Sequence, residues 1–245
     1  MISVCIPTYN GAVYIKEQLL SILSQLSSND EIIISDDEST DDTLAIIKSL
    51  NDCRIKVYVH KKTKSKFKSD YTTHNVENAL LKSSGDIIFL SDQDDLWIND
   101  KVKIMMDKLI DFDLILSDCQ IVNSQLKNIS SSYFEINNSK PGVINNIIKN
   151  SYLGCCMAFR RRVLEYALPF PVTGVAHDIW LGLIAETTGK VCFINSITLL
   201  YRRHEWTVTQ SGKKSNTSLM FKVLYRYKII KSLTGRILYL RLIKK

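Results

Sequence analysis

FLSDQDDLWINDK, residues 89–101, places four acidic residues directly after a run of strand-forming residues and includes a tryptophan among them. Asp92, Asp94 and Asp95 repel one another unless a cation sits among them, and hard divalent cations such as Mg²⁺ or Mn²⁺ prefer such oxygen ligands. These ions also leave coordination positions open for phosphate. The stretch therefore indicates a metal site at the end of a strand, with a solvated acidic loop as the alternative.

Strand and helix patterns alternate on the amino-terminal side of this stretch. Strands are expected at residues 2–7, 31–37, 54–60 and 86–92, and helices at 11–26, 39–50 and 74–84. This alternation predicts an α/β fold with a mostly parallel sheet and helices on both faces. In such sheets ligands bind at the carboxyl ends of the strands. Asp36, Asp37 and the Asp92 cluster all occupy such ends.

The pattern loosens beyond residue 112. A strand is expected at residues 113–122, a long polar loop at 123–146, helices at 143–154, 160–168 and 177–189, and a strand at 190–204. Residues 216–245 form a basic tail whose apolar residues recur every three or four positions, which predicts an amphipathic helix with one continuous apolar face. The residues expected on this face are Met220, Val223, Leu224, Tyr227, Ile230, Leu233, Ile237 and Leu240. We expect Gly235 to kink or split this helix.

Composition limits the class of protein. The chain has 245 residues, 45% of them hydrophobic, and a net charge of +7. No acidic residue follows Glu205, so only the tail requires an anionic partner, and we expect a membrane surface rather than nucleic acid. The six cysteines lack the spacing of a disulfide framework, which predicts reduced thiols. With no signal peptide and no membrane-spanning run in the sequence, we expect a cytoplasmic protein, peripheral on the cytosolic face of the inner membrane.

Two enzyme classes fit poorly. The first loop, PTYNGAVY, lacks the glycine pattern of a dinucleotide site, which disfavours hydride transfer. Phosphatases of the haloacid dehalogenase type place an Asp-x-Asp motif after the first strand, whereas here it follows the fourth. Asp36 and Asp37 either cap the next helix or accept hydrogen bonds from a nucleobase or a ribose.

Four segments in order resemble glycosyltransferase family 2, in particular its rhamnosyltransferase-like bacterial branch with a DQDDxW motif. They are ISVCIPTYNGAVYIKEQLLSILSQ, IIISDDESTDDT, GDIIFLSDQDDLWINDK and GVAHDIWLGLIAETTGKVCFINSITLLYRRHEWTVT. The resemblance implies a GT-A fold and a nucleotide-diphosphate-sugar donor, dTDP- or UDP-linked. It also implies Mn²⁺ or Mg²⁺ as cofactor and transfer with inversion at the anomeric carbon.

The resemblance also implies roles for single residues on the donor side. It assigns Pro7, Tyr9, Asp36 and Asp37 to the nucleoside, and Asn75 to a contact with the donor. Asp92 and Asp94 match the Asp-x-Asp pair, with Asp94 as the direct metal ligand and Asp95 beside it to orient sugar hydroxyls.

Asp178 in HDIW matches the catalytic base, and His204 falls where some relatives place a histidine that faces the metal or the diphosphate. Asp178 as a simple helix cap and His204 as an ordinary loop histidine remain open. Residues 152–171 resemble the acceptor-side segment, in which Gly154 permits close approach.

The sequence thus predicts a donor-binding half at residues 1–112, an acceptor-binding half at 113–215 and the tail at 216–245. The expected function is a metal-dependent inverting glycosyltransferase that extends a lipid-linked glycan in bacterial surface polysaccharide synthesis. The alternative is a catalytically silent sugar-nucleotide-binding or assembly subunit. The apolar face of the tail packs either on an anionic membrane, on the catalytic domain or on a second subunit in a homodimer.

Overall fold

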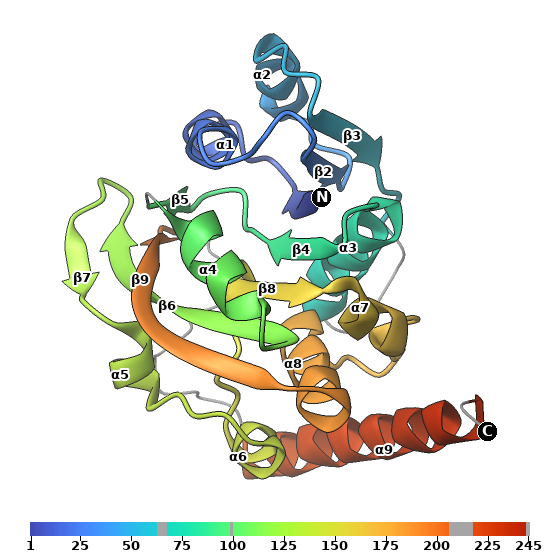
Figure 1. The fold of residues 1–245 in the computed structure, drawn as a ribbon. Coiled ribbons are helices and arrows are strands. Elements are labelled where there is room, and N and C mark those ends of the chain that lie inside the picture. Colours follow the sequence, from blue (N-terminus) through green and yellow to red (C-terminus); the bar gives the residue numbers. More distant parts are fainter. Residues whose placement is uncertain (63–67, 99, 206–217, 244–245) are drawn as a thin grey trace.

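The computed structural model describes residues 1–62, 68–98, 100–205 and 218–243. Within them, one sheet runs in the order β3-β2-β1-β4-β8-β6-β9-β5, with β7 paired to β6 (Figure 1). The strands are β1 Ile2–Thr8, β2 Glu31–Asp36, β3 Ile55–Val59, β4 Ile87–Leu90, β5 Leu96–Trp97, β6 Leu114–Asn123, β7 Asn128–Ser130, β8 Met157–Arg160 and β9 Val191–Arg203. The pairs β1–β2, β2–β3, β1–β4 and β6–β9 are parallel, and the pairs β4–β8, β6–β8, β6–β7 and β5–β9 are antiparallel. The expected α/β fold is confirmed, with a parallel arrangement of β1 to β4 and a mixed arrangement in the rest of the sheet.

The helices pack against this sheet and against one another. They are α1 Ile15–Leu23, α2 Thr43–Ser49, α3 Lys68–Lys82, α4 Lys101–Leu109, α5 Tyr133–Asn137, α6 Val143–Ile148, α7 Arg161–Ala167, α8 His177–Thr188 and α9 Leu219–Ile243. α3 packs on β1 and β2, α4 on β6 and β8, and α8 on β9. Because β1, β2 and β4 are parallel neighbours, the loops that follow them emerge at the same edge of the sheet.

The region expected to be a long loop contains two elements, so that expectation is wrong in part. β7 extends the sheet beside β6, and α5 follows it directly. The Ser132 hydroxyl accepts the Glu135 backbone N–H at 3.0 Å and also donates to the buried Asp118 carboxylate. A tertiary contact therefore fixes the cap of α5, and a short polar segment becomes ordered.

The helix expected at residues 143–154 is also shorter than predicted, because α6 ends at Ile148. The chain then turns through a short 3₁₀ segment, Gly154–Cys156, into β8. β8 lies antiparallel between β4 and β6 and is almost fully buried. Four residues carry too little periodicity to predict a strand, so the neighbouring strands define it.

α9 differs from the single apolar face that we expected. Ile229, Leu233 and Leu240 are buried against the body of the protein, and α9 packs on α6 and α8 (Figure 1). Met220, Val223, Leu224, Tyr227 and Ile230, which were expected on the same face as Leu233 and Leu240, are instead exposed. The helix is apolar on two sides, because its large residues are spread around the axis.

The helix is also not split at Gly235, where a Cβ atom would meet nothing within 4 Å. The expected boundary at residues 215 and 216 lies outside the described residues. Among the residues that the structure describes, no helix is long and apolar enough to cross a membrane. All six cysteines are free thiols, as expected.

Candidate active site

Asp36 lies at the carboxyl end of β2 and is fully buried. Its carboxylate accepts hydrogen bonds from the Thr8 hydroxyl at 2.8 Å, the Ser39 hydroxyl at 2.6 Å and the Ser39 backbone N–H at 2.8 Å. The loop after β2 is thereby fastened to the end of β1, where Pro7 and Thr8 lie. Asp36 acts in the structure as an anchor for these two loops.

Asp37 contacts a residue that we did not single out from the sequence. Its Oδ1 atom lies 2.6 Å from Nδ1 of His60, which follows β3. Burial raises the pKa of Asp37 above its ordinary value, although the hydrogen bond from His60 opposes this rise. Nearby, Tyr9 is half exposed and the Lys62 ammonium lies 3.1 Å from the centre of its ring. A carboxylate, an imidazole and an aromatic ring thus lie along one edge of the sheet.

Asn75 on α3 faces the same edge. Its Nδ2 donates to the Thr8 carbonyl at 3.3 Å, and the side chain is buried. Among the described residues, its Oδ1 atom has no hydrogen-bond partner. A buried amide oxygen is costly to leave unpaired, so this position suits a donor group from a ligand.

The acidic loop after β4 brings Asp94 against His204, which follows β9. Oδ2 of Asp94 lies 2.7 Å from Nε2 of His204, and the His204 ring stacks on Tyr14. These residues are 110 positions apart in the chain. The contact between Asp94 and His204 therefore cannot be predicted from their positions in the sequence. It forms because β9 ends next to the acidic loop.

Asp92 and Asp95 form a second group with Cys155, whose ligand atoms all lie within 4.8 Å of one another. Burial, and after it the neighbouring charges of Asp94 and Asp178, raise the pKa of Asp92 to about 7. Burial also raises the pKa of Asp95, with the neighbouring carboxylates adding to it. Oδ2 of Asp95 is buried and, within the described part of the chain, has no hydrogen-bond partner. Carboxylates that raise one another's pKa in this way form an acidic site next to Asp94, and such a site suits a bound cation.

Arg202, near the end of β9, binds this acidic loop. We did not single it out in the sequence analysis. Its backbone N–H donates to Asp95 Oδ1 at 3.0 Å, and its Nε donates to the Asp94 carbonyl at 2.8 Å. The guanidinium also pairs with Glu17 on α1 and lies 4.5 Å from the centre of the Tyr14 ring. Only its neighbour His204 was singled out, because a buried arginine and an exposed one look alike in a sequence.

Gln93 joins the acidic loop to the loop after β1. Its side chain accepts the Tyr9 N–H at 2.9 Å and donates to the Tyr9 carbonyl at 3.1 Å. A Cβ atom at Gly11 would lie 2.5 Å from Gln93 Oε1, so only glycine leaves room for this amide. The middle residue of the Asp-x-Asp pattern is therefore a structural bridge.

Asp178 lies in the first turn of α8, one residue after the start of the helix. The N-cap position belongs to Ala176, so Asp178 is not the cap. Its Oδ1 accepts the Ile179 N–H at 2.7 Å, and its Oδ2 accepts from Asn150 Nδ2 at 3.2 Å. A Cβ atom at Gly154 would lie 2.9 Å from Nε2 of His177, so the His177 side chain lies close to the backbone there. The close approach of an acceptor at Gly154 stays a prediction.

The sequence is similar to several bacterial glycosyltransferases. WfaP of Escherichia coli, a UDP-Glc:alpha-D-GlcNAc-diphosphoundecaprenol beta-1,3-glucosyltransferase, is 36% identical over 218 residues, 87% of this chain and 82% of WfaP. WfgD of Escherichia coli has the same described activity and is 25% identical over 230 residues, 92% of this chain and 83% of WfgD. The dTDP-rhamnosyl transferase RfbG of Shigella flexneri is 27% identical over 237 residues, 89% of this chain and 76% of RfbG.

Solved structures share the fold at low sequence identity. TarS of S. aureus in complex with UDP-GlcNAc has a TM-score of 0.68 and 21% identity, covering 97% of this chain and 66% of that one. Glucosyl-3-phosphoglycerate synthase of Mycobacterium tuberculosis, in complex with Mn²⁺, UDP and phosphoglyceric acid, has a TM-score of 0.58 and 18% identity, covering 96% and 78%. The fold is therefore GT-A, as the resemblance implied. The profile described as Glycosyl transferase family 2 matches residues 3–167, more than half of the chain, and this protein belongs to that family.

Proposed function

We propose that this glycosyltransferase is metal-dependent and inverting, and that it transfers a sugar from a dTDP- or UDP-sugar to a lipid-linked glycan in bacterial surface polysaccharide synthesis. One observation carries the proposal. Asp94 lies 2.7 Å from His204, in the same loop as Asp92 and Asp95, whose ligand atoms lie within 4.8 Å of each other. The relatives WfaP, WfgD and RfbG support the donor and acceptor classes.

The nucleoside is proposed to bind at the edge formed by β1, β2 and β3. Asp37 accepts an N–H of the base or a ribose hydroxyl, and His60 holds its carboxylate in place. Tyr9 offers a half-exposed ring to a flat ligand, and Asn75 offers its unpaired oxygen. Asp36 and Pro7 are proposed to contribute by holding the loops after β1 and β2 in place, because the Asp36 carboxylate is already hydrogen-bonded within the protein. The donor half at 1–112 and the acceptor half at 113–215 stay a prediction.

Asp94, His204 and Asp92 are proposed to hold the divalent cation. When bound, Mn²⁺ or Mg²⁺ neutralises negative charge on the diphosphate as it leaves. Asp94 and His204 already face each other at 2.7 Å, and Arg202 fixes the Asp94 backbone from the other side. Asp95, held by the Arg202 N–H, is proposed to orient sugar hydroxyls with its remaining oxygen.

Asp178 is proposed to take the proton from the acceptor hydroxyl as that oxygen attacks the anomeric carbon. The bond from that carbon to the diphosphate oxygen breaks on the opposite face, which inverts the configuration. One carboxylate suffices for this, because no covalent intermediate has to form. The Ile179 N–H and the Asn150 amide hold the carboxylate in one orientation.

The exposed side of α9 is proposed to bind an anionic membrane surface, where a lipid-linked acceptor resides. This side carries large apolar residues: Leu219, Met220, Val223, Leu224, Tyr227, Ile230, Leu238 and Leu242. Lys231 and Arg241 are exposed among them, and the helix contains no acidic residue. Apolar residues that enter the interface and basic residues that attract anionic headgroups are what such binding requires. The protein would then be peripheral on the cytosolic face of the inner membrane.

Release of nucleoside diphosphate from UDP-glucose and dTDP-rhamnose tests the chemistry. We expect Mn²⁺-dependent release that EDTA abolishes, and loss of that release in Asp94→Ala. In Asp178→Asn, turnover with a GlcNAc-diphosphate-lipid acceptor should fall by roughly 100- to 10,000-fold with little change in donor affinity. Asp107→Asn, an exposed carboxylate on α4, is the control. A protein that binds these donors with Mn²⁺ but never releases nucleoside diphosphate would be the silent subunit instead.

Sedimentation with vesicles tests the membrane proposal. The protein should sediment with phosphatidylglycerol vesicles at low salt and not with pure phosphatidylcholine. Leu224→Glu should reduce sedimentation, whereas Leu81→Glu, at an exposed position on α3, should not. Substitution is a better test than deletion of α9, because Ile229, Leu233 and Leu240 are part of the core. A protein that ignores both vesicle types but forms a dimer that Leu224→Glu dissociates would show that this side joins two subunits.

A further inference from the structure

The Asp178 carboxylate is oriented by two separate segments. One is the start of α8, whose Ile179 N–H donates to Oδ1. The other precedes β8, where Asn150 Nδ2 donates to Oδ2. Asn150 is itself fixed, because its Oδ1 accepts the Tyr152 N–H at 2.9 Å and its Nδ2 also donates to the Tyr152 carbonyl at 3.2 Å. A shift of either segment would therefore turn the carboxylate.

Both segments are attached to α9 by consecutive residues. The Tyr225 hydroxyl accepts the backbone N–H of Ala176, the N-cap of α8, at 3.3 Å. The Arg226 guanidinium donates to the carbonyl of Ile148, the last residue of α6, at 2.7 Å. Ala176 is two residues before Asp178, and Ile148 is two residues before Asn150. α9 runs along the outside of α6 and α8, so it spans both segments (Figure 1).

We propose that Tyr225 and Arg226 are positioning residues for Asp178, which makes the carboxyl-terminal helix part of the transfer machinery. The proposal rests on the proposed role of Asp178 as the base. Each residue acts through a backbone group of the segment that it holds. The Ala176 N–H belongs to the group of N–H donors at a helix start that need a partner outside the helix. The Tyr225 hydroxyl provides that partner.

A positioning role predicts a particular pattern of kinetic effects. Donor binding involves β1, β2 and the loop after β4, none of which contacts Tyr225 or Arg226 in the hydrogen bonds described. Loss of either residue should therefore lower kcat and leave the donor KM unchanged. A small displacement of a catalytic group costs rate steeply, and we expect a loss of roughly three- to tenfold for each single substitution.

The test compares Tyr225→Phe with Tyr239→Phe, which makes the same change at an exposed position of the same helix. Arg226→Met removes the donor to Ile148, and Arg226→Lys should restore most of the rate. Each variant is also made in an Asp178→Asn background, with UDP-glucose or dTDP-rhamnose as donor and the GlcNAc-diphosphate-lipid as acceptor. If the residues act through Asp178, each substitution should change the remaining rate less than twofold.

Amide hydrogen exchange adds a measurement that needs no substrate. Tyr225→Phe should speed exchange in residues 176–180, Arg226→Met should speed it in residues 148–152, and Tyr239→Phe should change neither. Equal loss of rate in both backgrounds, or unchanged exchange in both segments, would overturn the proposal. Near-native turnover of Asp178→Asn would instead refute the role of Asp178 as base. A loss in Asp178→Asn with no loss in Tyr225→Phe and Arg226→Met would refute the positioning role alone.

Discussion

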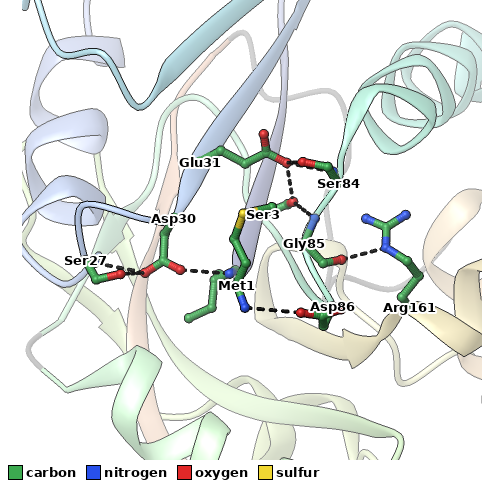
Figure 2. A network of polar contacts seen from close by, with 10 residues as sticks. Met1, Ser3, Ser27, Asp30, Glu31, Ser84, Gly85, Asp86 and Arg161 are labelled. Atoms are coloured by element: carbon green, nitrogen blue, oxygen red, sulfur yellow. Dashed lines mark hydrogen bonds and ion pairs between the residues drawn. The ribbon is translucent and has the colours of Figure 1, made fainter.

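Replacing Glu31 with glutamine should destabilise the protein in a way that depends on pH. Glu31 begins β2 at the end of the sheet opposite the active site and is almost fully buried. Its Oε1 accepts from the Ser3 hydroxyl at 2.6 Å and from Ser84 N–H at 2.6 Å, and its Oε2 accepts from Lys56 at 2.7 Å. Figure 2 shows how this carboxylate joins β1 to the segment that leads into β4. Glutamine keeps the shape but loses the charge.

The size of the effect follows from the pKa of Glu31. Burial alone would raise this pKa, but the hydrogen bonds from Lys56, Ser3 and Ser84 outweigh it and lower the pKa from 4.5 to about 2. Such a difference between the folded and the unfolded chain corresponds to about 3 kcal/mol at neutral pH. Because Lys56 is half exposed and water screens its charge, we expect about 2 kcal/mol. For a chain of this size, that lowers Tm by roughly 4–8 °C.

Urea unfolding at pH 7 and at pH 3 measures this contribution. Because the pKa of Glu31 is lower in the folded protein than in the unfolded chain, its stabilisation is complete at pH values above the unfolded-state pKa. This stabilisation is lost as the pH falls toward the folded-state pKa. The difference between the wild type and Glu31→Gln should therefore shrink from about 2 kcal/mol at pH 7 to about 1 kcal/mol at pH 3. Glu165→Gln, at an exposed position of α7, should change stability little at either pH. A difference that is the same at both pH values would refute the electrostatic reasoning.

Three further predictions concern single residues. Gly235→Ala should raise the free energy of unfolding by about 0.5–1 kcal/mol, because the helix is continuous and a Cβ there meets nothing; a lower Tm would contradict this. Arg202→Met should raise the Mn²⁺ concentration for half-maximal donor turnover roughly 10-fold or more, since it releases the Asp94 backbone; an unchanged Mn²⁺ dependence would separate Arg202 from the metal site. His60→Ala should raise the donor KM by roughly 5- to 10-fold with kcat unchanged, and a change in kcat alone would argue against a role in nucleoside binding.

The sequence was sufficient where a pattern is local. The alternation of strands and helices up to β4 was predicted, because each strand is a continuous apolar run and each helix repeats its apolar residues every three to four positions. The positions of Asp37, Asp92 and Asp94 at strand ends follow from the same alternation. β5 and β8 were missed, since strands of two and four residues exist only through their neighbours.

Some residues of the candidate site could be predicted from the sequence, and others could not. Residue type and position along the chain pointed to the Asp92 cluster, because carboxylates directly after a strand are visible in a sequence. The resemblance to the family singled out Asp94 within that cluster and Asp178 as the base. His60, Arg202 and Asn150 were not singled out, because their roles depend on contacts with residues 23, 108 and 28 positions away. No local pattern records such contacts.

The sequence by itself determined the family and the order of strands and helices in the amino-terminal half, because these depend on hydrophobic periodicity and on motifs within one segment. Only the tertiary structure decided which side of α9 is buried, because its apolar residues surround the helix and the choice depends on the surface that α6 and α8 offer. The same holds for Asp178, whose carboxylate accepts a hydrogen bond from Asn150 and whose flanking segments are bonded to two residues of α9. Long-range packing brings those segments together, and it is a property of the whole chain.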